Sequence, residues 1–332
     1  MDLIGYRTVT DAGTPLEQVA RNVVQRYLAV TATDRFLLVC DDATERPVLS
    51  ALLAAARETG CDATVASIAP RASSGEEPPA AVAAAMAASS VTLCAVSRSL
   101  YHTEAKGRAQ AGGTRGCFNA PHRADAWTHG AMTADFEQIR AVAERLADRL
   151  RGAGEVRVTS PAGTDVTMRI DGREPKGWLT GICRNPGEVS AYPGGEVSLP
   201  PLEGTAEGTI VIERVMTDLG ELSEPVVWTV REGLAVAVEG GADAARLRAL
   251  IAGVPGATNL AELGIGLNPL ARIGEFITES KKRLGTAHFA LGDNAGGYGG
   301  VVECPLHLDG MVLEATVVVD GVDVVRDGVL TL

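Results

Sequence analysis

The chain has 332 residues, a net charge of −12 and 46% hydrophobic residues, and this length predicts two domains, each with its own core. The acidic balance argues against a nucleic-acid partner, because phosphate binding needs a basic surface and the 30 lysine and arginine residues are scattered. No apolar run approaches the roughly 18 to 20 residues of a spanning helix, so we expect no membrane partner, and the lack of a signal-peptide pattern at residues 1–7 predicts a cytoplasmic protein.

Strand and helix patterns alternate over the first half of the chain. In chain order we expect an amphipathic helix at 14–30, a strand at 36–40, a helix at 45–60, a strand at 63–66, a helix at 80–88, a strand at 91–96 and a helix at 135–151. Apolar strands that alternate with helices are typical of a parallel sheet covered on both faces. The pattern therefore predicts an α/β domain with a parallel sheet over residues 1–152.

A loop with polar and basic residues opens after the strand that ends at Val96. It contains His102, and Arg115 follows further along the chain. Ligands of open α/β sheets bind outside the carboxyl ends of the strands, so this cluster could hold a substrate carboxylate. The alternative is a solvated loop face with no binding role.

Short alternating segments separated by turn residues follow Gly152. We expect antiparallel strands at 155–159, 165–170, 208–213, 226–230 and 234–238, and helices at 243–253 and 274–282. The pattern predicts a β-rich α+β domain over residues 153–332.

Two of the five histidines, His288 and His307, lie in this second domain, and Asp309 follows His307 by two residues. Side chains repeat every second residue along a strand, so an extended segment at 306–309 would direct His307 and Asp309 to the same face. Imidazole and carboxylate ligands suit zinc, iron, manganese or cobalt. The alternative is an aspartate that holds a core histidine by a hydrogen bond.

Two glutamates, Glu196 and Glu262, lie among apolar and glycine-rich neighbours, where an unpaired carboxylate is costly. A metal ion would offset that cost. If both join the histidines and Asp309, the surplus of ligands suggests two metal ions that clamp a water, which is hydrolase chemistry. The competing hypothesis keeps only His288, His307 and Asp309 as the two-histidine, one-carboxylate face of a non-haem Fe(II) oxygenase.

The order and spacing of several segments resemble the aminopeptidase T family of metallo-aminopeptidases over nearly the whole chain. The matching segments are 99–105, 160–165, 193–197, 261–269, 285–294 and 307–310. The resemblance implies a two-metal centre of zinc, manganese or cobalt, a homodimer, and a peptide or other small-molecule amide as substrate. The metal ligands that it implies are Glu196, Glu262, His288, His307 and Asp309.

Further roles follow from the same resemblance. Tyr298 stands where the family has a metal-site tyrosine, and His102 and Arg115 could reach the substrate. Independently of the resemblance, the hydrolase hypothesis needs a nearby carboxylate as the catalytic base, and we expect Glu262 or Glu275 in this role.

A related branch holds the 2,5-dihydroxypyridine dioxygenases, which are mononuclear Fe(II) enzymes with the same His-x-Asp pattern. In that branch we expect a histidine near position 262, so the glutamate favours the hydrolase. Our prediction is therefore a metal-dependent hydrolase, with the Fe(II) dioxygenase as the alternative and a non-catalytic metal-binding or ligand-binding protein as a third hypothesis.

Overall fold

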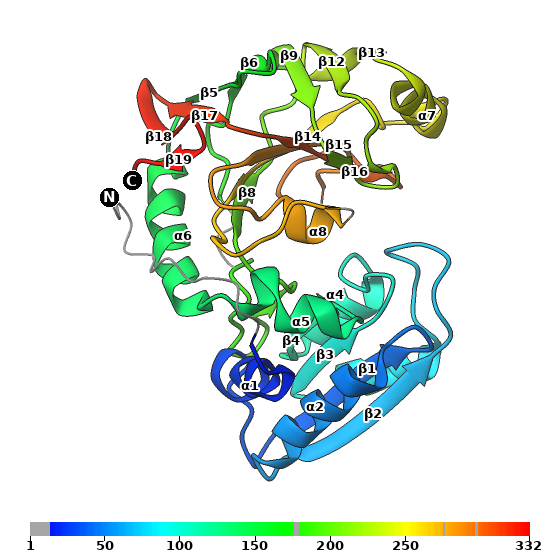
Figure 1. Ribbon diagram of the computed structural model, residues 1–332. Coiled ribbons are helices and arrows are strands. Elements are labelled where there is room, and N and C mark those ends of the chain that lie inside the picture. Colours follow the sequence, from blue (N-terminus) through cyan, green and yellow to red (C-terminus); the bar gives the residue numbers. More distant parts are fainter. Residues whose placement is uncertain (1–13, 176–178, 275, 296–297) are drawn as a thin grey trace. The chain divides into compact units, whose positions relative to one another are not determined.

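The computed structural model (Figure 1) describes residues 14–175, 179–274, 276–295 and 298–332. The described chain divides into two compact units. Residues 14–140 and 179–194 form one, which we call the parallel-sheet unit. Residues 141–175 and the described part of 195–332 form the other, which we call the antiparallel unit.

The parallel-sheet unit contains a five-stranded sheet in the order β2-β1-β3-β4-β7, with every neighbouring pair parallel. Its elements are α1 (Leu16–Arg21), η1 (Asn22–Tyr27), β1 (Arg35–Asp41), α2 (Arg46–Arg57), β2 (Asp62–Ile68), α3 (Ala80–Ala88), β3 (Val91–Ala95), α4 (Glu104–Ala111), β4 (Arg115–Ala120), α5 (Ala124–Thr128), η2 (Gly130–Thr133) and β7 (Val189–Ser190), with the start of α6 (Phe136–Leu150). All five residues of β3 are buried, as expected for a central strand. The predicted parallel sheet is confirmed.

The antiparallel unit contains an eight-stranded sheet, β13-β12-β9-β6-β5-β17-β18-β19, and a six-stranded sheet, β11-β10-β16-β15-β14-β8. Its elements are β5 (Glu155–Thr159), β6 (Asp165–Arg169), β8 (Glu196–Leu199), β9 (Glu207–Ile212), β10 (Val215–Met216), β11 (Gly220–Glu221), β12 (Val226–Arg231), β13 (Leu234–Glu239), α7 (Ala242–Ile251), β14 (Leu260–Gly266), α8 (Ile277–Ser280), β15 (Ala287–Gly292), β16 (His307–Val312), β17 (Thr316–Val319), β18 (Val322–Arg326) and β19 (Val329–Leu330). The β-rich second half and the mixed α/β class are confirmed.

One predicted helix is much shorter than expected. The helix at 274–282 is reduced to the single turn α8, which ends at Ser280. The chain after it bonds to the segment that follows β14, because the Asn268 amide donates to the Lys282 carbonyl and the Leu284 amide donates to the Asn268 carbonyl. These bonds fix the backbone of Lys282, and the Lys281 amide donates to the Ile277 carbonyl of α8.

The strands β14, β15 and β16 lie side by side in the six-stranded sheet (Figure 1). Every residue of β14 and β15 is buried, so both faces of these strands are covered. Within the described part of the chain, no helix is both long enough and apolar enough to span a bilayer.

Candidate metal centre

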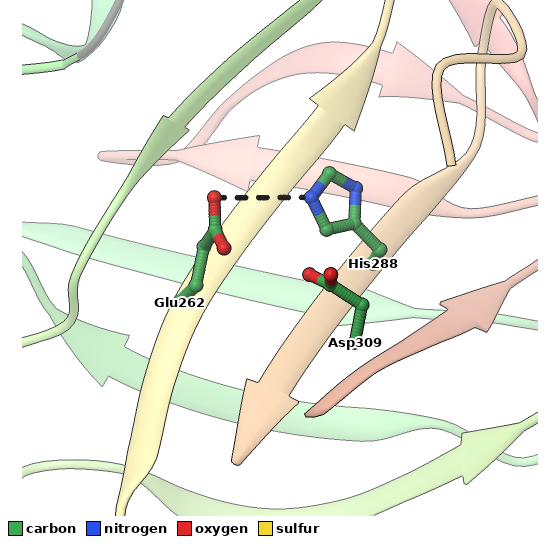
Figure 2. A group of neighbouring side chains, drawn as sticks. All are labelled: Glu262, His288 and Asp309. Atoms are coloured by element: carbon green, nitrogen blue, oxygen red, sulfur yellow. Dashed lines mark ion pairs between the residues drawn. The ribbon is translucent and has the colours of Figure 1, made fainter. Parts of the chain in front are cut away.

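Three buried side chains from neighbouring strands converge in the six-stranded sheet. Glu262 comes from β14, His288 from β15 and Asp309 from β16, and one ligand atom of each lies within 4.8 Å of the others. Figure 2 shows these side chains pointing toward one another. The Nε2 of His288 lies 3.9 Å from the Oε1 of Glu262. One imidazole and two carboxylates at this separation could hold a single metal ion.

The strand register explains the convergence. Glu262 pairs with Ala290 on β15, and Ala290 pairs in turn with Asp309 on β16, so the three residues form one row across the sheet. His288 lies two residues before Ala290 and therefore points to the same face. The small side chain of Ala290 leaves room between the two carboxylates.

Glu196 and His307 lie on this same face. Glu196 pairs with Gly266, four residues after Glu262, and His307 pairs with Gly292. All five ligands that the resemblance implied are thus brought together. The predicted side-by-side placement of His307 and Asp309 is confirmed, because the His307 Nε2 lies 3.6 Å from the Asp309 Oδ1.

Glycine makes room for the His288 ring. Gly264 pairs directly with His288 across the ladder, and a Cβ at Gly264 would lie 2.0 Å from the His288 Cε1. No real Cβ contact is that short, so the imidazole occupies the space that a side chain at 264 would fill.

The His307 ring is oriented by hydrogen bonds at both nitrogens. Its Nδ1 lies 2.8 Å from the Asp293 carbonyl oxygen, and its Nε2 lies 2.8 Å from the Glu262 Oε2. Because a carbonyl only accepts, Nδ1 donates and Nε2 faces the carboxylates. Burial lowers the pKa of His307, but the neighbouring Asp309 and Glu262 carboxylates outweigh burial and raise it to about 10.

Several buried ligand atoms of this cluster have no hydrogen-bond partner among the residues that the structure describes. They are the Oε2 of Glu196, the Oε1 of Glu262 and both ring nitrogens of His288. Buried polar atoms are nearly always paired, because an unpaired one retains its full desolvation cost. The Glu262 oxygen and the His288 Nε2 face each other, so an ion between them would satisfy both. The residues therefore fit a divalent metal.

Two lysines that the sequence analysis did not select complete the cluster. The Lys281 Nζ lies 3.2 Å from the Asp309 Oδ1 and 3.6 Å from the Glu196 Oε2. The Lys282 Nζ lies 2.9 Å from the Glu196 Oε1. The chain has only four lysines beside 26 arginines, and this adjacent pair is the signal that could have revealed them.

The lysines and histidines keep the carboxyl groups ionised. Burial favours the protonated form of Glu196, Glu262 and Asp309, but Lys281 and the other neighbouring lysine and histidine side chains together outweigh burial and lower the pKa of all three. For Lys281, burial is outweighed by the Asp309 and Glu196 carboxylates, which raise its pKa. Burial prevails at Lys282 and lowers its pKa.

Tyr298 lies against this centre. Its ring stacks on the His307 imidazole with the ring centroids 4.9 Å apart. The structure thus brings Tyr298 to the predicted ligands, whereas Glu275 lies outside the described residues.

The other two predicted substrate-binding residues belong to the parallel-sheet unit. His102 is exposed and contacts the Tyr101 ring edge-on. Arg115 is buried; its guanidinium donates to both carboxylate oxygens of Asp34, at 3.1 and 2.9 Å, and to the carbonyls of Leu28 and Ala29. With these donors engaged inside the unit, Arg115 has a structural role, and the substrate contacts expected of Arg115 and His102 stay predictions.

A buried cluster of histidines and carboxylates in a mixed α/β fold is a candidate metal site, and the family match identifies the class of protein as an enzyme. The chain belongs to the 2,5-dihydroxypyridine 5,6-dioxygenase family, whose model matches residues 18–332. The dioxygenase branch, which the sequence analysis gave as the alternative to the hydrolase, is therefore the family of this protein. A search of curated protein sequences found no significant match.

Two solved structures share the fold. The 2,5-dihydroxypyridine dioxygenase of Pseudomonas putida KT2440 is 20% identical, with a TM-score of 0.80 over 97% of this chain and 98% of that one. Wild-type AmpT of Thermus thermophilus is 18% identical, with a TM-score of 0.67 over 96% of this chain and 99% of that one. The resemblance to aminopeptidase T is confirmed for the fold.

Proposed function

We propose that the protein is a mononuclear Fe(II) dioxygenase that opens a hydroxylated heteroaromatic ring. The observation that carries the proposal is the convergence of Glu262, His288 and Asp309, with unpaired ligand atoms on the first two. Membership of the dioxygenase family supports the choice of reaction and of substrate class.

The residues that would hold the iron are Glu262, His288, His307 and Asp309. Bound iron would supply the one-electron chemistry that lets dioxygen react with a closed-shell aromatic ring. Two imidazoles and a carboxylate match the non-haem Fe(II) donor set, and the second carboxylate makes this site more acidic than that set. The hydrogen bond from the His307 Nδ1 to the Asp293 carbonyl keeps the opposite nitrogen directed at the site.

Burial of the donors favours this chemistry. Glu262 and His288 are fully buried and Asp309 is 8% exposed, so bulk water has little access to the ligand atoms. The more exposed His307, stacked on Tyr298, marks the side from which a flat aromatic substrate would approach.

Metal-dependent hydrolysis of a peptide or small amide is the second candidate. It is favoured by Glu196, whose Oε2 lies 3.6 Å from the His288 Nε2 and adds a third carboxylate to the cluster. In that reaction zinc, manganese or cobalt would be the metal and Glu262 the base. The homodimer and the cytoplasmic location stay predictions for either function.

The two candidates are separated by one set of assays. Metal-free protein is loaded anaerobically with Fe(II), and oxygen consumption is measured with 2,5-dihydroxypyridine; a parallel sample loaded with Zn(II), Mn(II) or Co(II) is tested on leucine p-nitroanilide. We expect oxygen uptake with ring opening in the first assay and none with the His288→Ala variant. Release of p-nitroaniline by the second sample, together with no oxygen uptake by protein that holds iron, would establish the hydrolase instead.

A further inference from the structure

The lysine pair occupies the side of the cluster where Glu196 lies. Lys282 is 2% exposed with its Nζ 2.9 Å from the Glu196 Oε1, and Lys281 is 7% exposed with its Nζ between the Glu196 Oε2 and the Asp309 Oδ1. Both oxygens of Glu196 therefore face an ammonium group.

The presence of lysine instead of arginine at 281 and 282 indicates that the space beside Glu196 needs a compact cation. Arginine supplies 26 of the 30 basic residues, yet both residues here are lysine. A guanidinium is planar and spreads five donors over a wide fork, whereas an ammonium is a small point charge that takes oxygens from several directions. An ammonium among carboxylate oxygens is thus a compact positive charge that can partly neutralise them in the place where a metal ion would otherwise lie.

Charge balance limits what else the cluster can hold. In the metal-bound state both imidazoles must be neutral, so the carboxylates of Glu196, Glu262 and Asp309 and the two lysines contribute one net negative charge. One divalent ion changes this to one net positive charge. A second divalent ion would leave three uncompensated positive charges in a buried site, which is strongly unfavourable.

We propose that Lys281 and Lys282 take the place of a second metal ion, hold Glu196 as their counterion and limit the centre to one ion. The inference rests on the proposed metal site. It gives this chain a mononuclear centre even though the five ligands implied for a two-metal centre are all present. The lysines are positioning residues: they fix Glu196 and Asp309, and they do not react.

The test is the number of metal ions bound per chain. The full chain is freed of metal with a chelator, incubated with Mn(II), desalted and measured by elemental analysis and electron paramagnetic resonance. We expect one Mn(II) and an isolated six-line spectrum for the wild type. The double variant Lys281→Met/Lys282→Met should bind two Mn(II) ions with a spin-coupled spectrum, because Glu196 is released as a ligand.

Lys106→Met is the matched control, because Lys106 lies over the Tyr101 ring in the parallel-sheet unit and should leave one ion per chain. Two ions in the wild type, or one ion in a folded double variant, would overturn the inference. Wild-type protein that binds no Mn(II), Fe(II) or Zn(II) would contradict the proposed metal-dependent function itself.

If circular dichroism shows that the double variant does not fold, the role of Glu196 is tested with a single variant instead. Glu196→Gln removes the counterion but no ligand of the single ion, so its Mn(II) affinity should stay within about tenfold of wild type. Glu262→Gln removes a ligand and should lose about 100-fold. Equal losses in the two variants would show that Glu196 binds the metal, and the inference would fail.

Discussion

The Tyr298 ring lies nearly parallel to the His307 imidazole, with an interplanar angle of 17° and centroids 4.9 Å apart. The stack adds a third restraint to a ring already held at Nδ1 by the Asp293 carbonyl and at Nε2 by the Glu262 carboxylate. His307 is therefore fixed in orientation before any ligand binds.

Removing the stack should weaken metal binding. For Tyr298→Ala we expect about a tenfold loss of Fe(II) or Mn(II) affinity, because supporting contacts orient the ligand. Tyr298→Phe keeps the ring and should change the affinity less than about twofold. A competition titration with a chelating dye measures both, and equal losses in the two variants would assign the effect to the phenol group instead of the stack.

Filling the space beside His288 should disrupt the centre. Gly264→Ala places a methyl group 2.0 Å from the His288 ring, so the imidazole must move. We expect metal affinity to fall by about tenfold or more. Gly274→Ala is the control in the same unit, because a Cβ there meets nothing within 4 Å. Unchanged metal binding in folded Gly264→Ala protein would show that His288 is not a ligand.

A bound metal should stabilise the folded chain. The unpaired Glu262 and His288 atoms gain a partner only in the native state, so metal at 100 times its Kd should add about 2.7 kcal/mol to the free energy of unfolding. Thermal unfolding of metal-free and Mn(II)-loaded protein measures the shift in Tm. Glu262→Gln should show a much smaller shift; a shift as large as that of wild type would place the metal elsewhere.

The Asp34–Arg115 ion pair should contribute stability that acid removes. Burial raises the pKa of Asp34, but the Arg115 guanidinium and other hydrogen bonds outweigh burial and lower it to about 2. A carboxyl group whose pKa is lowered on folding stabilises the fold at every pH above its unfolded-state pKa, which is near 4. This contribution is lost as the pH falls toward 2. Asp34→Asn should therefore cost about 3 to 5 kcal/mol at pH 7, and its difference from wild type should shrink between pH 4 and pH 2.

Asp165→Asn is the control for this comparison. Asp165 also pairs with an arginine through two short bonds, at 2.8 Å each, but both side chains of the pair are more than half exposed. Solvent screens such a pair, so the loss should be much smaller. Urea unfolding at several pH values measures both variants, and equal costs would contradict a special role for the buried pair.

The fold was largely predictable because its elements have clear boundaries. The helix expected at 80–88 coincides with α3, which Pro79 precedes, and the strand expected at 155–159 coincides with β5. The strands β14 and β15 were not predicted. Both of their faces are buried and glycines interrupt one of them, so apolar and polar residues do not alternate along these strands. Every second residue of these strands is either a candidate ligand or small. The alternate residues are Glu-Gly-Gly from Glu262 and His-Ala-Gly from His288, and together they form one face of the sheet.

The candidate site was predictable only in part. The ligands could be selected as unusual polar residues, but strand register decides which of them meet, and register depends on long-range pairing. Lys281 and Lys282 were missed because adjacent lysines normally indicate a solvated surface. The ion pair of Arg115 could not be predicted, since its partner Asp34 is 81 positions away in sequence.

The lysine pair also bears on how the protein matures in a cell. Many small metal-binding domains stay unfolded until their ion arrives, because the binding of the metal supplies most of their folding free energy. Here two ammonium groups already balance two of the three carboxylates, so the sheet can close around the ligands without metal. We therefore expect metal loading to be a late step, separate from folding, in which a newly made chain persists in folded form until the cell supplies the ion.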